Sequence, residues 1–151
     1  MGQSLVKQYT HIIFSTKYQK PLIIDSVEED LYRYIGGICK NMECYPIKIG
    51  GYRNHVHILC LLSKKIALMK LLEKVKSHSS QWVKTKDECM KNFYWQNGYG
   101  AFSVNPSQVN RVKSYIKNQH IHHRKKTFQE EYLEFLKEYN IRFPVPYLLM
   151  N

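Results

Sequence analysis

The sequence predicts an α+β fold of the ferredoxin-like kind, in which helices pack on an antiparallel sheet. Segments rich in β-branched and aromatic residues alternate with longer segments of helical periodicity, in the order β-α-β-β-α-β-α-α. Two of the strand segments follow one another directly, as strands of an antiparallel hairpin do. The 151 residues, 44% of them hydrophobic, suffice for one domain with its own core.

The first half of the chain contains the hairpin. Residues 8–15 predict a strand, and residues 26–42 predict a helix that begins after Pro21 with Asp25 or Ser26 as its cap. Residues 45–52 and 54–62 predict two strands. The neighbouring Gly50 and Gly51 indicate a hairpin or a bulge in this region.

The second half is mainly helical. Residues 65–86 predict a helix, and the aromatic, glycine-containing residues 93–104 predict one or two short strands around a tight loop. Asn105 and Pro106 are typical of a helix start, so a tyrosine-bearing helix should run from there to about His122, followed by a helix over 127–139. We therefore expect one domain over 1–143 and a tail over 144–151.

Charge indicates the class of partner. Lys plus Arg number 23 against 12 for Asp plus Glu, a formal net charge of +11, which favours a polyanion: nucleic acid first, an anionic membrane surface second. We find no apolar run typical of a signal peptide or a membrane span. The four cysteines fit neither a zinc ribbon nor a disulfide framework, so a cytoplasmic protein with free thiols is expected.

The His55-Val56-His57 segment is a candidate metal half-site. Side chains at positions i and i+2 of a strand share a face, so two imidazoles should lie side by side while Val56 packs on the core. Neighbouring imidazoles on a rigid strand can bind a divalent cation with a third ligand from elsewhere. The alternative is that both are ordinary hydrogen-bonded strand histidines.

The other histidines give weaker signals. His120 and His122 also stand two apart, but at a helix end, where such side chains diverge by about 200°. We interpret the segment from His120 to Lys126 as a basic helix end that could contact phosphate groups. His11 and His78 are interpreted as structural, although His78 lies in a polar segment and could touch DNA.

Tyr115 is a candidate nucleophile. Tyr115 and Gln119 are four residues apart and share a helix face. A phenol has a pKa of about 10, so it needs a metal charge or a local base to attack a phosphorus atom. Gln119 could supply a neutral oxygen as the third metal ligand. The alternative is that Tyr115 merely packs on the apolar stripe beside Val112.

Taken in order, four segments resemble the single-tyrosine HUH transposases of small bacterial insertion sequences, the IS200-like transposase family, where U is a hydrophobic residue. They are the strand from His11 to Tyr18, Asn54 to His57, Lys76 to Ser80, and Trp95 to Phe102 followed by Tyr115 to Gln119.

The resemblance implies a reaction that spacing alone does not show. His55, His57 and Gln119 would hold Mg²⁺ or Mn²⁺, and Tyr115 would form a 5′-phosphotyrosine bond and release a 3′-OH. The protein would be a transposase that nicks and rejoins single-stranded DNA ends carrying hairpins. It would act as a homodimer in which the tyrosine helix of one subunit completes the histidine site of the other. Many relatives carry Asp where Asn54 stands here.

Candidate DNA contacts are basic or aromatic: Lys17, Arg53, Lys76, Tyr99, Lys113 and Lys117. Two other functions stay open from the sequence. One is a non-catalytic nucleic-acid-binding protein of the same fold, and the other is an HUH nickase of replication initiation or plasmid transfer.

Overall fold

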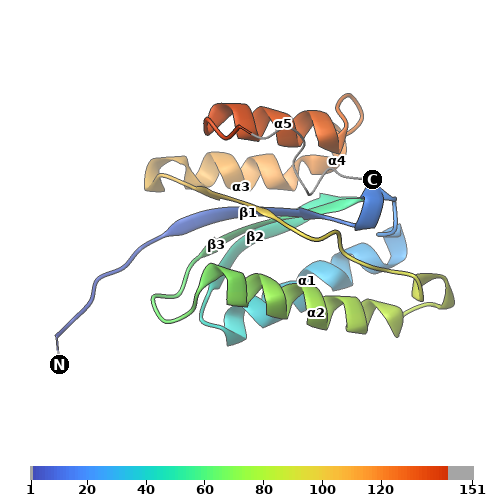
Figure 1. Ribbon diagram of the computed structural model, residues 1–151, viewed down its shortest axis with the longest axis horizontal. Coiled ribbons are helices and arrows are strands. Elements are labelled where there is room, and N and C mark those ends of the chain that lie inside the picture. Colours follow the sequence, from blue (N-terminus) through green and yellow to red (C-terminus); the bar gives the residue numbers. More distant parts are fainter. Residues whose placement is uncertain (1, 143–151) are drawn as a thin grey trace.

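A computed structural model describes residues 2–142, so the expected tail over 144–151 lies outside the described residues. Figure 1 shows the elements, joined by the short 3₁₀ turns η1 (Lys17–Gln19), η2 (Glu88–Met90) and η3 (Pro106–Gln108). The strands are β1 (Tyr9–Ser15), β2 (Tyr45–Tyr52), β3 (His55–Leu61) and β4 (Gly100–Ser103). The helices are α1 (Asp25–Asn41), α2 (Leu68–Lys84), α3 (Val109–Lys117), α4 (Gln119–His122) and α5 (Phe128–Glu138).

The four strands form one antiparallel sheet in the order β2-β3-β1-β4. Helices α1 and α2 lie on one side of it and α3, α4 and α5 on the other (Figure 1). This arrangement confirms the predicted α+β fold. It also places β3, which carries the histidine pair, in the interior of the sheet between β2 and β1.

Strand alternation divides the side chains between the two layers. Ile12 and Phe14 of β1 and Val56 and Ile58 of β3 are fully buried in the main apolar core, whose burial supplies most of the folding free energy. All four cysteines are free, as expected, and Cys89 is the exposed one. None of the helices within residues 2–142 is long and apolar enough to cross a membrane.

The predicted start of α1 is wrong by one residue. Ile24 is the N-cap, and no side chain caps this end, while Asp25 is already helical. Ile24 packs against the core next to the fully buried Ile23, so apolar packing sets where the helix begins. Asp25 and Glu28 still lie in the first turn, where the helix dipole favours negative charge.

The single helix expected from Pro106 to His122 is also wrong. The Asn105 side chain caps a short 3₁₀ turn by accepting from Ser107 N at 2.9 Å, and α3 begins after it. The chain then leaves helical geometry at Asn118 (φ −97°, ψ 19°), so Tyr115 belongs to α3 and Gln119 begins α4. Tyr115 and Gln119 therefore do not share one continuous helix face.

The glycine pair allows close approach of backbones. The hairpin between β2 and β3 is confirmed, but the bulge lies at Pro46–Lys48 and not at the glycines. A Cβ on Gly50 would lie 2.9 Å from both Cγ2 and the carbonyl oxygen of Ile116. Helix α3, which carries Tyr115, thus rests directly on the β2 backbone at Gly50.

Candidate functional site

The two histidines of β3 lie under the layer formed by α3, α4 and α5. His55 and His57 are fully buried, and their rings stand 5.1 Å apart, centroid to centroid. Their side chains share one face of the strand, as the alternation predicts. The neighbouring Val56 is buried on the other face, in the main core.

Glu131 of α5 is the acidic member of the site. Its Oε1 lies 3.1 Å from His57 Nε2 and 3.4 Å from His55 Nε2. Within the described residues these three groups offer ligand atoms that all lie within 4.8 Å of one another, a set able to hold a metal ion. The residue is 1% exposed, and a buried carboxylate is costly unless it is paired.

The surroundings of Glu131 keep it ionised. Burial raises the pKa of its carboxyl, but the charge of His57 and hydrogen bonds from neighbouring imidazoles outweigh burial. The pKa of Glu131 therefore lies well below its usual range.

Sequence reasoning missed Glu131, although a signal was present. Phe128, Tyr132 and Leu136 form the buried stripe of α5 at helical spacing, and Glu131 falls on the same stripe. A charged residue in a buried stripe requires a partner, and that requirement indicates a site.

Gln119 and Tyr115 meet the histidines through Glu131. The Gln119 amide donates from Nε2 to Glu131 Oε2 at 2.8 Å, which turns its Oε1 toward His55 Nε2, also at 2.8 Å. The Tyr115 hydroxyl donates to the same Oε2 of Glu131. Burial and the Glu131 carboxylate raise the pKa of Tyr115 well above its ordinary value, so the phenol is protonated in this arrangement. One chain thus brings together all four residues that the sequence singles out.

The surroundings of His55 fit a cation. Its Nδ1 lies 2.8 Å from Asn54 Oδ1, while its Nε2 lies 2.8 Å from Gln119 Oε1. Both ring nitrogens therefore face oxygen atoms, but a neutral imidazole has only one N–H. Burial lowers the pKa of His55 to about 4, which opposes a second proton. A divalent cation at Nε2 relieves this conflict, so the residues fit a metal ion, with Asn54 orienting the ring.

His11 is more than the isolated structural histidine that we expected. It is almost fully buried, and its Nε2 lies 2.7 Å from His57 Nδ1. Burial, and then the charge of His57, lowers the pKa of His11 well below its ordinary value. In the sheet register His11 lies opposite Leu59, so it shares a face with His57 two residues away. The pairing register of β1 and β3 predicts the contact between His11 and His57. That register is set when the sheet folds, so the sequence alone did not show it.

The expected basic helix end closes over the site. His123 Nε2 lies 3.0 Å from Gln119 Oε1, and its Nδ1 lies 2.7 Å from the carbonyl oxygen of Lys126. His120 Nε2 lies 2.6 Å from Glu28 Oε1 and so ties α4 to α1. A pocket of about 410 Å³ lies beside Asn54 and His123, and its lining includes Arg124, Lys125 and Lys126.

The candidate DNA contacts fall into two groups. Lys17, Arg53, Lys113 and Lys117 are exposed. Tyr99 is half-buried and packs against the main core. The Nζ of Lys76 donates to the carbonyl oxygens of Gln96 at 2.9 Å and Gly98 at 2.5 Å, and burial lowers its pKa to about 8. Lys76 therefore ties α2 to the segment before β4.

Comparisons with known proteins bear on this arrangement. A search of curated proteins finds no match to the chain. Among solved structures, a candidate transposase from Deinococcus radiodurans R1 is 19% identical, with a TM-score of 0.62 over 79% of this chain and 96% of that one. A REP-associated tyrosine transposase bound to a REP hairpin is 12% identical, with a TM-score of 0.60 over 82% of this chain and 73% of that one.

These two likenesses show that the fold is shared. The model of the family described as "Transposase IS200 like" matches residues 4–119, a stretch that includes all of the sheet and both histidines of β3. Since this match spans well over half of the sequence, the chain belongs to the IS200-like transposase family.

Proposed function

We propose that this protein is a DNA transposase that nicks and rejoins single-stranded DNA ends through a covalent bond to Tyr115. The observation that carries the proposal is that Tyr115, Gln119 and Glu131 meet His55 and His57 in one buried cluster. Structural packing alone does not require a nucleophile, a carboxylate and two imidazoles to converge. Buried polar clusters of this kind are typical of catalytic sites.

The chain's residues account for the proposed step. The Tyr115 oxygen attacks the phosphorus of a phosphodiester, forming a bond to the 5′-phosphate and breaking the bond to the 3′-oxygen. The phenolic proton leaves along the hydrogen bond that the hydroxyl donates to Glu131 Oε2 and passes on to solvent, since the lowered pKa of Glu131 does not let the carboxylate keep it. The displaced 3′-oxygen takes up a proton from solvent and leaves as a 3′-OH. Because the ester retains the energy of the broken bond, a 3′-OH can reverse the step and rejoin the strand.

The metal would be held by His55, His57 and Glu131, with the Gln119 oxygen beside them. Bound there, Mg²⁺ or Mn²⁺ would polarise the phosphate and favour the phenolate form of Tyr115. Two imidazole nitrogens suit Mn²⁺ better than Mg²⁺, which prefers oxygen ligands. The two oxygens of Glu131 would have different roles. Oε1 faces the imidazoles and would bind the metal, while Oε2 accepts the hydrogen bond from Tyr115.

The proposed substrate is single-stranded DNA with hairpin ends. A protein that acts on this DNA would work in the cytoplasm. The net charge of +11 and the exposed Lys113 and Lys117 of α3 support binding to a phosphate backbone. The basic pocket beside Asn54 and His123 adds a place for a phosphate close to the cluster. The structural neighbour that binds a REP hairpin supports a hairpin ligand.

We further propose a homodimer, and here the structure supports an arrangement other than the one the resemblance implies. All five residues of the cluster come from one chain. Helix α3 is seated on the same chain's β2 through the Gly50–Ile116 contact. We therefore propose that each site is assembled within one chain.

The decisive experiment is a covalent-adduct assay. The protein is incubated with Mn²⁺ or Mg²⁺ and single-stranded oligonucleotides covering the sequences that flank its own gene. A protein–DNA adduct that survives a denaturing gel is expected for wild type and not for Tyr115→Phe, which keeps the ring but lacks the attacking oxygen. His57→Ala should abolish the adduct and leave salt-sensitive DNA binding intact.

Each failure has its own meaning. An adduct with Tyr115→Phe would show that another residue is the nucleophile. Salt-sensitive binding without any wild-type adduct would favour a non-catalytic nucleic-acid-binding protein. Loss of both adduct and binding in His57→Ala would give His57 a structural role.

A further inference from the structure

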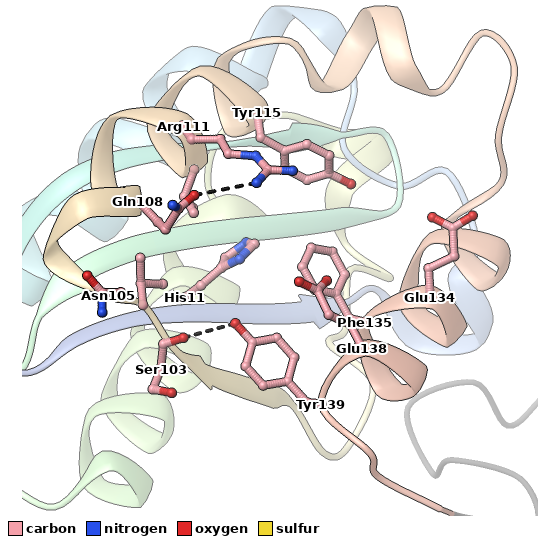
Figure 2. A pocket seen from close by; sticks show the side chains of 12 residues that line it. His11, Ser103, Asn105, Gln108, Arg111, Tyr115, Glu134, Phe135, Glu138 and Tyr139 are labelled. Carbon is pink, nitrogen blue, oxygen red and sulfur yellow. Dashed lines mark hydrogen bonds between the residues drawn. The ribbon is translucent and has the colours of Figure 1, made fainter.

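A cavity of about 450 Å³ opens beside Tyr115 between α3, α5 and the β4 edge of the sheet. Figure 2 shows its lining, with Tyr115, Arg111 and Gln108 on one side and Phe135, Glu138 and Tyr139 on another. His11, which contacts His57, also lines it. The cavity therefore shares two walls with the candidate active site but lies outside the metal-binding cluster.

The cavity has aromatic walls suited to a flat ring. The Phe135 ring lies 5.9 Å from that of Tyr115 and 5.2 Å from that of His11, centroid to centroid. The Tyr139 ring is fixed by a hydrogen bond from its hydroxyl to the carbonyl oxygen of Ser103 at 2.9 Å (Figure 2). Unpaired nucleobases are recognised by stacking on such side chains.

The rim carries groups that can read the edge of a base. Gln108 and Asn105 are exposed amides, and Arg111 Nη1 donates to Gln108 Oε1 at 3.4 Å. Amide and guanidinium groups hydrogen-bond the carbonyl and ring-nitrogen acceptors of bases. Across the cavity, the carboxylate of Glu138 can accept from a base amino or imino group.

The cavity lining carries charges of both signs. Glu134 lines the cavity as well, and its two oxygens lie 2.8 and 2.7 Å from Lys126 Nζ. Glu138 adds a second carboxylate to the lining. Lys126 offsets the charge of Glu134, and the lining also contains the cationic Arg111, so the charges of the cavity largely balance. A neutral base entering this lining meets no net charge penalty.

We propose that this cavity binds the base of the nucleotide next to the scissile phosphate, and that Gln108 and Arg111 select which base is accepted. The inference rests on the proposed reaction at Tyr115 for its biological role. A base held in this cavity is turned out of the DNA strand. Because Tyr115 forms one wall of the cavity, the phosphate of that same nucleotide lies next to Tyr115. Part of the sequence preference of cleavage then comes from the protein itself.

The test measures binding without cleavage. It uses the Tyr115→Phe protein and five-residue deoxyribose-phosphate strands in which the central position alone carries a base. A wholly abasic strand of equal length is the reference. We expect at least one of the four bases to bind about tenfold more tightly than the abasic strand, since stacking contributes a gain of this order.

Two variants in the Tyr115→Phe background locate the effect. Gln108→Trp fills the cavity from an exposed turn, so it should remove the difference between the best base and the abasic strand. Arg111→Ala should change the ranking of the four bases. Arg33→Ala, which alters an exposed arginine of α1 on the other side of the sheet, should change neither.

The outcomes separate this inference from the proposed reaction. Equal binding of all five strands overturns the base site, even if wild type forms adducts. A base preference that survives Gln108→Trp overturns it too, because the base then binds elsewhere. If Gln108→Trp removes the base preference but the protein with Tyr115 intact forms no adduct with DNA, the base site is supported and only the proposed reaction is contradicted.

Discussion

At the residue scale, the site depends on one buried carboxylate. Glu131 accepts two hydrogen bonds at one oxygen, from Tyr115 and Gln119, and faces the imidazoles with the other. Removing one partner of a buried carboxylate leaves a charge or a hydrogen-bond donor unpaired. The free-energy cost of that unpaired group exceeds the net stabilisation that the interaction gave. The consequence is that small changes at Glu131 should affect both metal binding and the nucleophile.

Glu131→Gln tests this dependence with almost no change of shape. The amide is neutral, so we expect Mn²⁺ affinity to fall about 10- to 100-fold. We expect the rate of adduct formation to fall about 100-fold, as for loss of a catalytic base. Calorimetric titration with Mn²⁺ and a timed adduct assay measure the two. Glu29→Gln, an exposed carboxylate of α1, is the matched control; an Mn²⁺ affinity equal to wild type in Glu131→Gln would exclude Glu131 as a ligand.

His11 should act through His57. Its Nε2 lies 2.7 Å from His57 Nδ1 and orients the ring, and loss of such a partner lowers metal affinity about tenfold or more. We expect this loss in His11→Leu and partial recovery in His11→Gln, whose side chain can restore a hydrogen bond. His78→Ala, which removes an exposed histidine, should leave affinity unchanged. Equal affinities of His11→Leu and wild type would show that the contact is only packing.

At the scale of elements, helix α3 is positioned by contact of its backbone with β2. A Cβ at Gly50 would meet Ile116 at 2.9 Å, closer than ordinary packing allows, and one of the two contacted atoms is a backbone oxygen that cannot rotate away. The position of Tyr115 therefore depends on a residue of another element, Gly50, which pairs with His57 in the sheet.

Gly50→Ala should displace α3 and misplace Tyr115. Overpacking of this kind costs about 1–3 kcal/mol of stability. A displacement of the order of 1 Å can reduce a rate about 100-fold, so we expect at least a tenfold fall in adduct rate. Gly37→Ala is the control, because a Cβ at Gly37 would meet no atom within 4 Å and alanine suits a helix. Thermal unfolding and the adduct assay are compared; a wild-type rate in a destabilised Gly50→Ala would mean that α3 tolerates the shift.

The elements themselves could mostly be predicted from local pattern. Alternation and helical periodicity are properties of neighbouring residues, so the order of strands and helices and the hairpin of β2 and β3 were expected correctly. The break at Asn118 was not. It separates α3 from α4, whose His120 contacts Glu28 of α1, and such contacts involve residues far apart in the sequence.

At the scale of the whole molecule, the sheet separates two layers with different tasks. The layer of α1 and α2 buries the aliphatic core, while the layer of α3, α4 and α5 covers β3 and completes the site (Figure 1). Tyr115 of α3, Gln119 of α4 and Glu131 of α5 reach the same cluster over β3, and this convergence is the basis for our proposal that each site is assembled within one chain.

Mixing two inactive variants tests this arrangement. Tyr115→Phe keeps the histidines and His57→Ala keeps the nucleophile, and the two are coexpressed with tags of different size. If each site is assembled within one chain, neither chain can react, and we expect no adduct. In a dimer with shared sites, the His57→Ala chain would react by using its partner's histidines, so an adduct on that chain would contradict the proposal.

The sequence by itself determined the fold class, the shared face of His55 and His57 and, with the family resemblance, the candidates Tyr115 and Gln119. These follow from periodicity and from residue types in a given order. Tertiary structure alone decided that Glu131 joins the cluster, that His11 contacts His57 and that α3 rests on Gly50. The reason is physical: a buried carboxylate, a strand register and a backbone contact each depend on residues distant in the chain, which only folding brings within a few ångströms.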